Sequence, residues 1–322
     1  MDLHLISGFL GSGKTTAIVH LSKMLMRTGL KVGVITNDQG KYLVDTAFIN
    51  AEDIPAVDVQ SGCFCSHLDD LLEQIEHLRQ KVDPDLIFAE SIGTAGNLVG
   101  TVVQPLLNGT SYFAKSLSVL ADARLLLRFC RGLSLPFSDS VCSLYKGQII
   151  ESDILIVNKI DLVSESDIIL LKKRLPEIFP GKDTLFQSAF NEDDIAAWYR
   201  FISGMQNCAQ QGSGLDDSVK RLALGRFGWH EKVYEFSDAA DIHDMLLGFL
   251  EKLLNALERA HCTIGHIKCF IRTENGTYYK VSILSFDDAA WKTSLSPLHA
   301  KYATLIMNAR ILTDEPIDHV FP

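Results

Sequence analysis

The chain has 322 residues and a formal net charge of −10; 47% of its residues are hydrophobic and 22% are charged. Such a chain can bury a full core, which excludes a mainly disordered protein and favours about two domains. The acidic balance argues against nucleic acid or an anionic membrane as the main partner, because those surfaces attract clustered Lys and Arg.

The sequence contains no run of about 18 consecutive apolar residues, so we expect no membrane-spanning helix. The N-terminus lacks a basic region ahead of its apolar run, which argues against a signal peptide. The seven cysteines are scattered without a framework. This cysteine usage favours reduced thiols in a cytoplasmic protein.

Patterns typical of strands and helices alternate from the N-terminus to Phe201. Short apolar runs predict buried strands, and apolar residues at helical spacing predict the helices between them. The alternation predicts an α/β fold with a mostly parallel, doubly wound sheet that helices cover on both faces. The expected strands are 3–7, 32–36, 57–60, 86–89, 117–121 and 154–157, and the expected helices are 15–28, 68–82, 97–107, 164–175 and 193–201.

The pattern changes after a polar segment, 206–217, which contains Gly and Ser and has the composition of a linker. The rest of the chain predicts a smaller α+β domain with one long amphipathic helix. Asn275-Gly276 between two alternating apolar runs predicts a hairpin. We therefore place domains at 1–210 and 225–322. The expected elements of the second domain are strands 232–236, 265–272, 277–286 and 304–311 and helix 242–261.

A glycine-rich segment, GFLGSGKT at residues 8–15, fits the phosphate-loop pattern G-x-x-x-x-G-K-[ST]. An apolar strand precedes it and an amphipathic helix follows it, as the motif requires. Its glycines let successive backbone N–H groups and the helix N-terminus face a phosphate. We expect Lys14 to bridge the outer phosphates and the Thr15 hydroxyl to ligate Mg²⁺. The expected nucleotide contacts are Gly8, Gly11, Ser12, Gly13, Lys14, Thr15 and Thr16.

A second motif, NKID at residues 158–161, follows the apolar strand 154–157. The Asp161 carboxylate can accept hydrogen bonds from both N1–H and the exocyclic amine of guanine, whereas adenine lacks this donor pair. The motif therefore predicts GTP rather than ATP, with the Lys159 stem over the base and Asn158 tying this loop to the phosphate loop. A backbone N–H from a later segment is expected at the guanine carbonyl. The expected base contacts are Asn158, Lys159, Asp161, Ser188 and Ala189.

Other segments accompany these motifs in order: SGFLGSGKTT, ITNDQG, VQSGCFCSHLDDLLEQI, DPDLIFAESIGTAGN and SDILIVNKIDL. Together they resemble the CobW/HypB/UreG family of P-loop GTPases, and its CobW-like branch in particular. The resemblance covers residues 1–205, and the C-terminal α+β domain is similar to the CobW C-terminal domain without a comparably specific motif. It implies a P-loop GTPase domain at 1–210, a CobW-like domain at 225–322, and GTP hydrolysis with Mg²⁺.

The resemblance also implies a transition-metal site, because the CobW-like branch carries G-C-x-C-C with metal-binding thiolates. Here the segment GCFCSH, residues 62–67, keeps two cysteines, has Ser66 in place of the third, and adds a histidine. Thiolates and an imidazole suit Zn²⁺ or Co²⁺, so Cys63, Cys65 and His67 are the candidate ligands. The alternative is structural: two small buried thiols at a helix start, with His67 capping that helix or exposed.

Two further segments suggest catalytic groups through the same resemblance. Where the family commonly has N-E-x-G-E, this chain has NDQGK, so Asp38 keeps a carboxylate and Lys41 inverts a charge. The segment ESIG at 90–93 is similar to the family's E-[ST]-x-G. This implies that Glu90 supports Mg²⁺ or orients water and that the Gly93 N–H senses the γ-phosphate. The catalytic candidates are Lys14, Asp38 and Glu90, and Asp122, at another strand end, is expected only to support loop structure.

The resemblance implies a GTP-hydrolysing metallochaperone or metallocofactor-assembly protein that serves a client metalloenzyme or assembly protein. The cysteine loop lies between the two segments expected to respond to the γ-phosphate, so hydrolysis could change its metal affinity. The competing interpretation is a metal-free, GTP-dependent activator of a corrinoid or other cofactor enzyme, favoured by the altered cysteine motif and the lack of a His-rich tract. An ATP-dependent small-molecule kinase is a third reading, which Asp161 disfavours. A homodimer is left open.

Overall fold

The computed structural model describes the chain except for residues 38–42, 60–61, 65, 136, 209–211, 213, 215–226, 238–241, 288–289, 296–299, 314–316 and 322. The chain divides into two compact units. Unit 1 comprises Met1–Gln39 and Glu52–Ala223, and unit 2 comprises Gly40–Ala51 and Leu224–Pro322. No helix within the described ranges is both long and apolar enough to span a bilayer.

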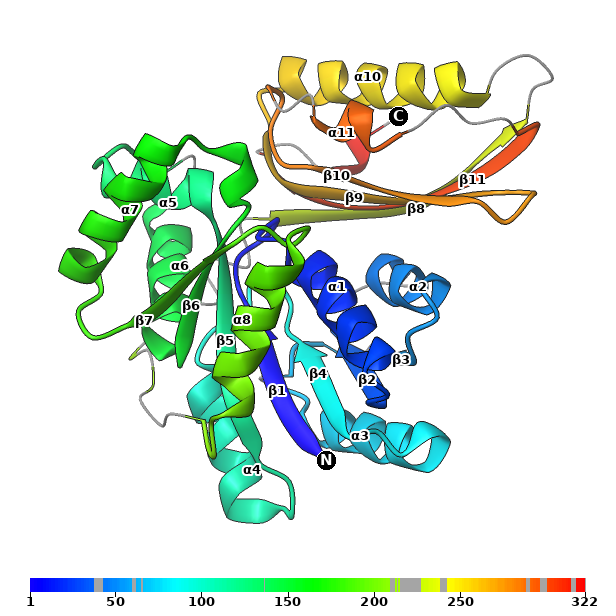
Figure 1. Cartoon of the computed structure of the whole chain (residues 1–322). Coiled ribbons are helices and arrows are strands. Elements are labelled where there is room, and N and C mark those ends of the chain that lie inside the picture. Colours follow the sequence, from blue (N-terminus) through cyan, green and yellow to red (C-terminus); the bar gives the residue numbers. More distant parts are fainter. Residues whose placement is uncertain are drawn as a thin grey trace. The chain divides into compact units, whose positions relative to one another are not determined.

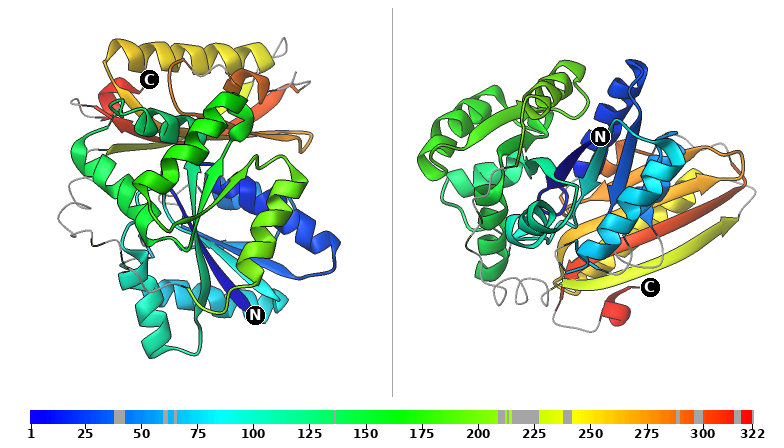
Figure 2. Two further views of the ribbon diagram at one scale, coloured as in Figure 1. Left: turned by 60° about the vertical axis from the view of Figure 1, so that its left-hand side comes forward. Right: turned by 90° about the horizontal axis from the view of Figure 1, so that it is seen from below.

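Unit 1 is built on a seven-stranded sheet in the order β3-β2-β4-β1-β5-β6-β7, and every neighbouring pair is parallel. Helices lie on both faces of this sheet (Figures 1 and 2). Every residue of β2, β4 and β6 is buried, as expected for strands covered on both sides. The predicted doubly wound α/β fold is therefore confirmed. The strands are β1 (Asp2–Ser7), β2 (Val32–Thr36), β3 (Ala56–Asp58), β4 (Leu86–Glu90), β5 (Ala114–Asp122), β6 (Ile154–Asn158) and β7 (Asp183–Gln187).

The five predicted helices of unit 1 are present, and one of them differs in form from the prediction. The stretch predicted as one helix at 97–107 contains a π-helical turn, η1 (Val99–Val103), followed by α4 (Gln104–Gly109). Two α-helices, α5 (Ala123–Cys130) and α6 (Asp139–Glu151), and the short 3-10 helix η2 (Ile160–Leu162) were not predicted. Helix α6 buries Gln148 and Glu151 among its apolar residues, which obscures the apolar stripe of a typical surface helix. The remaining helices are α1 (Lys14–Arg27), α3 (Leu68–Val82), α7 (Glu165–Ile178) and α8 (Glu192–Ser203).

Unit 2 is built on a four-stranded antiparallel sheet in the order β10-β9-β11-β8, and α10 lies along one face of it (Figure 1). The predicted hairpin is confirmed: β9 and β10 pair around Gly276, which has a φ of 82° that suits glycine. The long helix buries its leucines in the core of this unit, as its amphipathic pattern predicts. The elements are β8 (Phe227–Ser237), α10 (Ile242–Arg259), β9 (Thr263–Thr273), β10 (Tyr278–Ile283), α11 (Ala290–Thr293), β11 (Tyr302–Leu312) and α12 (Ile317–Val320).

Unit 2 also contains α2 (Val44–Ala51), although along the chain this helix lies between β2 and β3 of unit 1. Its Asp45 is buried, with 4% exposure, and forms ion pairs with Lys268 of β9 and with Lys280 of β10, the latter at 3.1 Å. The Lys280 ammonium also lies 4.4 Å from the centre of the Phe48 ring. This helix was not predicted from the sequence, and no local pattern indicates contacts between residues 223 positions apart.

Candidate nucleotide-binding site

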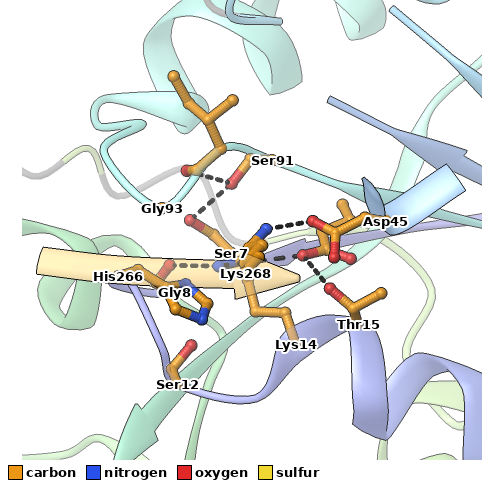
Figure 3. Close-up of polar contacts among 12 residues, drawn as sticks. Ser7, Gly8, Ser12, Lys14, Thr15, Asp45, Ser91, Gly93, His266 and Lys268 are labelled. Carbon is orange, nitrogen blue, oxygen red and sulfur yellow. Dashed lines mark hydrogen bonds and ion pairs between the residues drawn. The ribbon is translucent and has the colours of Figure 1, made fainter. Parts of the chain in front are cut away.

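The predicted phosphate contacts form a loop between β1 and α1 (Figure 3). Gly8, Gly11 and Gly13 have φ angles of 138°, 72° and 89°, which glycine adopts at no steric cost. A Cβ at Gly8 would lie 2.1 Å from the carbonyl oxygen of Leu120, so a larger residue does not fit there. Among the described residues, the buried Ser12 hydroxyl has no hydrogen-bond partner. The loop therefore offers an unused donor beside the N-terminus of α1, which suits a phosphate.

Three predicted functional residues meet at the start of α1. Lys14 Nζ donates to the carbonyl oxygen of Gly8 at 2.9 Å and lies 4.0 Å from Glu90 Oε1 (Figure 3 shows Lys14 and Gly8). The Thr15 hydroxyl donates to the same Glu90 oxygen at 3.0 Å. Hydroxyl, carboxylate and phosphate oxygens are the ligands that Mg²⁺ prefers, so these residues fit a magnesium ion held at the phosphates.

The segment after β4 lies directly on the phosphate loop. The Ser91 hydroxyl donates to Ser7 Oγ at 3.0 Å (Figure 3). The Ser91 N–H donates to the carbonyl oxygen of Ile6 at 2.9 Å. A Cβ at Gly93 would lie 2.9 Å from the backbone nitrogen of Leu10, so only glycine permits this approach. Gly93 is therefore next to the phosphate loop, as a contact to the γ-phosphate requires.

The NKID loop is tied to the phosphate loop in the way that the sequence predicts. Asn158 Nδ2 donates to the carbonyl oxygen of Ser12 at 2.8 Å. Lys159 Nζ donates to the carbonyl oxygen of Gly11 at 2.5 Å. The backbone of Lys159 is left-handed, with a φ of 64°. A Cβ at Gly13 would lie 2.5 Å from Asn158 Nδ2, so the two loops are in van der Waals contact.

Asp122, at the end of β5, has a role that the sequence analysis missed. Its Oδ2 lies 3.2 Å from Lys159 Nζ, and its Oδ1 accepts the backbone N–H of Arg124 at 2.8 Å. Burial alone would raise the pKa of Asp122, but the Lys159 ammonium and the Arg124 contacts outweigh burial and lower it. Asp122 is thus ionised and orients Lys159, and the pairing of β5 with β6 is the feature that brings them together.

Of the other predicted base contacts, the Asp161 side chain is accessible to solvent, whereas the Ser188 N–H already donates a hydrogen bond within the protein. Asp161 lies in η2 and its side chain is exposed, so it is accessible to a base. The Ser188 N–H, by contrast, donates to Asp194 Oδ2 at 2.9 Å. Because that N–H is engaged, Ala189 is the better candidate for the backbone donor to the guanine carbonyl.

The cysteine loop is fastened by Asn37, which follows β2 and for which the sequence analysis assigned no role. The side-chain amide of Asn37 donates to the carbonyl oxygens of Val59 and Gly62, and its Oδ1 accepts the Phe64 N–H at 3.1 Å. Asn37 is 5% exposed. Asn37 is the first residue of the segment 37–41, which is expected to respond to the γ-phosphate. Asn37 therefore links this segment to both sides of the loop that contains Cys63.

The candidate metal ligands are only partly described. Cys63 is buried and disulfide-bonded, so the prediction of reduced thiols is wrong for Cys63. The His67 side chain forms no cap on α3, and its buried Nδ1 has no hydrogen-bond partner among the described residues. Cys65, like the catalytic candidate Asp38, lies outside the described residues. Within the part of the chain that the structure describes, no three His, Cys, Asp or Glu side chains are grouped as a metal site.

The doubly wound sheet, the phosphate loop and the NKID loop together define a P-loop nucleotide-binding protein. Residues 2–186 match the family model described as "CobW/HypB/UreG, nucleotide-binding domain". This match covers more than half of the chain, and the chain therefore belongs to the CobW/HypB/UreG family of P-loop GTPases.

Individual relatives are distant. The chain is 25% identical over 211 residues to the Zinc-regulated GTPase metalloprotein activator 1 of Dictyostelium discoideum, a match that covers 56% of this chain and 44% of that protein. It is 30% identical over 202 residues to the urease accessory protein UreG of Metallosphaera sedula, covering 57% and 84%. It is 23% identical over 278 residues to the zinc chaperone CobW of a Sinorhizobium species, covering 77% and 72%. The match thus spans less than half the length of the Dictyostelium relative.

Proposed function

We propose that this chain binds GTP with Mg²⁺ and hydrolyses it. The observation that carries the proposal is the direct link between the guanine-reading loop and the phosphate loop through Asn158 and Lys159. A purine nucleotide held by both loops has its base and its phosphates fixed by one connected structure. Membership of the CobW/HypB/UreG family supports the same conclusion.

The chemistry would come from positioning and charge rather than from a covalent intermediate. Lys14 would neutralise charge on the outer phosphates, and Thr15 would ligate Mg²⁺, with Glu90 holding the Thr15 hydroxyl in place. Bound Mg²⁺ supplies charge neutralisation between the β- and γ-phosphates. Glu90 is the described candidate for orienting the attacking water, and Asp38 is the other candidate.

Nucleotide selection gives the first test. Replacing one acceptor of Asp161 by a donor, in Asp161→Asn, leaves a guanine N–H unmatched and is expected to weaken GTP binding by about 1–3 kcal/mol. Binding of GTP, GDP and ATP to both proteins should be measured by calorimetry. Asp139→Asn, an exposed aspartate at the start of α6, is the matched control and should bind GTP like the wild type. Equal affinity of the wild type for ATP and GTP would show that Asp161 does not read the base.

We further propose that the protein is a metallochaperone whose cargo is Zn²⁺ or Co²⁺, bound at Cys63, Cys65 and His67. The zinc-related names of two relatives support this, as does a His67 imidazole nitrogen that is buried and without a described partner. Asn37 offers a route by which the nucleotide state could change the loop. The partner would be a client metalloenzyme or cofactor-assembly protein in the cytoplasm.

Metal binding gives the second test, and it must be made under reducing conditions because only the thiolates bind metal. We expect Co²⁺ to produce a thiolate charge-transfer band in the wild type, with binding that weakens as the pH falls. The double variant Cys63→Ser/Cys65→Ser should lose the band, while Cys142→Ser, a free cysteine on α6, should keep it. A wild type without the band, or a double variant that binds Co²⁺ equally well, would favour the metal-free activator of a cofactor enzyme.

A further inference from the structure

Helix α6 contacts both loops that would surround the phosphates. Its Tyr145 ring meets the ring of Phe9, in the phosphate loop, edge-on at 5.8 Å. One turn later, Gln148 Nε2 donates to the carbonyl oxygens of Gly93 at 3.1 Å and of Ala95 at 2.6 Å. Gln148 has no exposed surface. The two amide hydrogens of one buried side chain therefore hold the carbonyl groups of the two residues that flank Thr94.

This contact adds two hydrogen bonds to a turn whose Ile92 and Ala95 side chains are packed in the hydrophobic core of unit 1. The Ala95 N–H donates to the carbonyl oxygen of Ile92 at 2.9 Å, which closes the turn. The Thr94 hydroxyl is buried but makes no hydrogen bond within the described residues, so it does not fasten the turn. Gly93 lies close to the phosphate loop, because a Cβ added at this residue would lie 2.9 Å from the Leu10 nitrogen. Gln148 adds its hydrogen bonds to this contact.

We propose that Gln148 is a positioning residue that holds residues 92–95 against the phosphate loop before nucleotide binds. The inference rests on the proposed GTPase function, in which the Gly93 N–H contacts the γ-phosphate. A turn that is already in place loses less conformational entropy when it meets that phosphate. Gln148 therefore supports binding and reaction of GTP and contributes little to GDP, which has no γ-phosphate.

The test replaces Gln148 by Met, which has a similar volume but no donor. In nucleotide-free protein, deuterium uptake by peptides covering residues 91–96 should increase, whereas uptake in β6 should not. In turnover, kcat for GTP should fall by about 10–100-fold because a displaced loop misplaces the reacting groups. The dissociation constant for GDP should stay within about threefold of the wild type.

Ile149→Ala is the matched control, because Ile149 is the next residue, is equally buried, and makes no hydrogen bond to the turn among those described. It should lower the thermal midpoint without changing uptake at 91–96 or the ratio of GTP to GDP affinity. Gln148→Asn is a second variant, which keeps an amide but is one methylene shorter, and it should give intermediate uptake. Unchanged uptake and turnover in Gln148→Met, or an equal loss of kcat in Ile149→Ala, would overturn the proposal. A wild type that does not hydrolyse GTP would refute the GTPase function, while the uptake comparison would still decide the role of Gln148.

Discussion

Replacing Lys14 by Ala is expected to reduce GTP turnover by at least about 100-fold, the effect of removing a charge-stabilising group from a preorganised site. Lys14 is 7% exposed, and its ammonium lies between the carbonyl oxygen of Gly8 and the carboxylate of Glu90. In that position it would neutralise charge that develops on the outer phosphates. Phosphate release under single-turnover conditions measures the chemical step directly.

Lys23→Ala separates this effect from a general loss of positive charge on α1. Lys23 lies on the same helix, but its side chain is 47% exposed and its ion pair with Glu52 is at the surface. We expect this control to turn over GTP like the wild type, with a small change in stability. A Lys14→Ala protein that is folded by thermal unfolding and retains wild-type turnover would show that this loop does not bind the reacting phosphates.

Replacing Asp45 by Ala is expected to destabilise unit 2 by about 3–5 kcal/mol, because it leaves two partly buried ammonium groups without their shared carboxylate. Those groups belong to Lys268 and Lys280, on neighbouring strands. Deuterium uptake in peptides of β9 and β10 measures the effect without assuming that the whole chain unfolds in one step. Glu251→Gln, which removes the exposed ion pair with Lys292, should cost about 1 kcal/mol or less.

The same residue predicts a dependence on pH. Burial by itself raises the pKa of Asp45, but the two lysines outweigh burial and hold the pKa well below its ordinary value of 3.8. The unfolded chain therefore takes up this proton at a higher pH than the folded chain does. The stabilisation from Asp45 is complete above the ordinary value and declines as the pH falls below it towards the folded pKa. Protection of β9 that is equal in wild type and Asp45→Ala at neutral pH would show that α2 does not support this sheet.

The loops at the nucleotide site could be predicted because each depends on neighbouring residues. The phosphate loop needs glycines at positive φ, a lysine and a helix start within eight positions, and the NKID loop needs one buried strand before it. Both patterns can be recognised from the sequence alone. The alternation of apolar runs with helical patterns was sufficient to predict the parallel sheet, because strands that helices cover on both faces must be apolar on both sides.

The sequence by itself thus determined the fold class, the phosphate loop and the position of the NKID loop. Only the tertiary structure decided that Asp122 orients Lys159, that Asn37 holds the cysteine loop, that Gln148 supports the turn at Gly93, and that α2 belongs to unit 2. The physical reason is distance along the chain. These contacts join polar residues tens to hundreds of positions apart, and they exist only after strand order and register have brought the residues together.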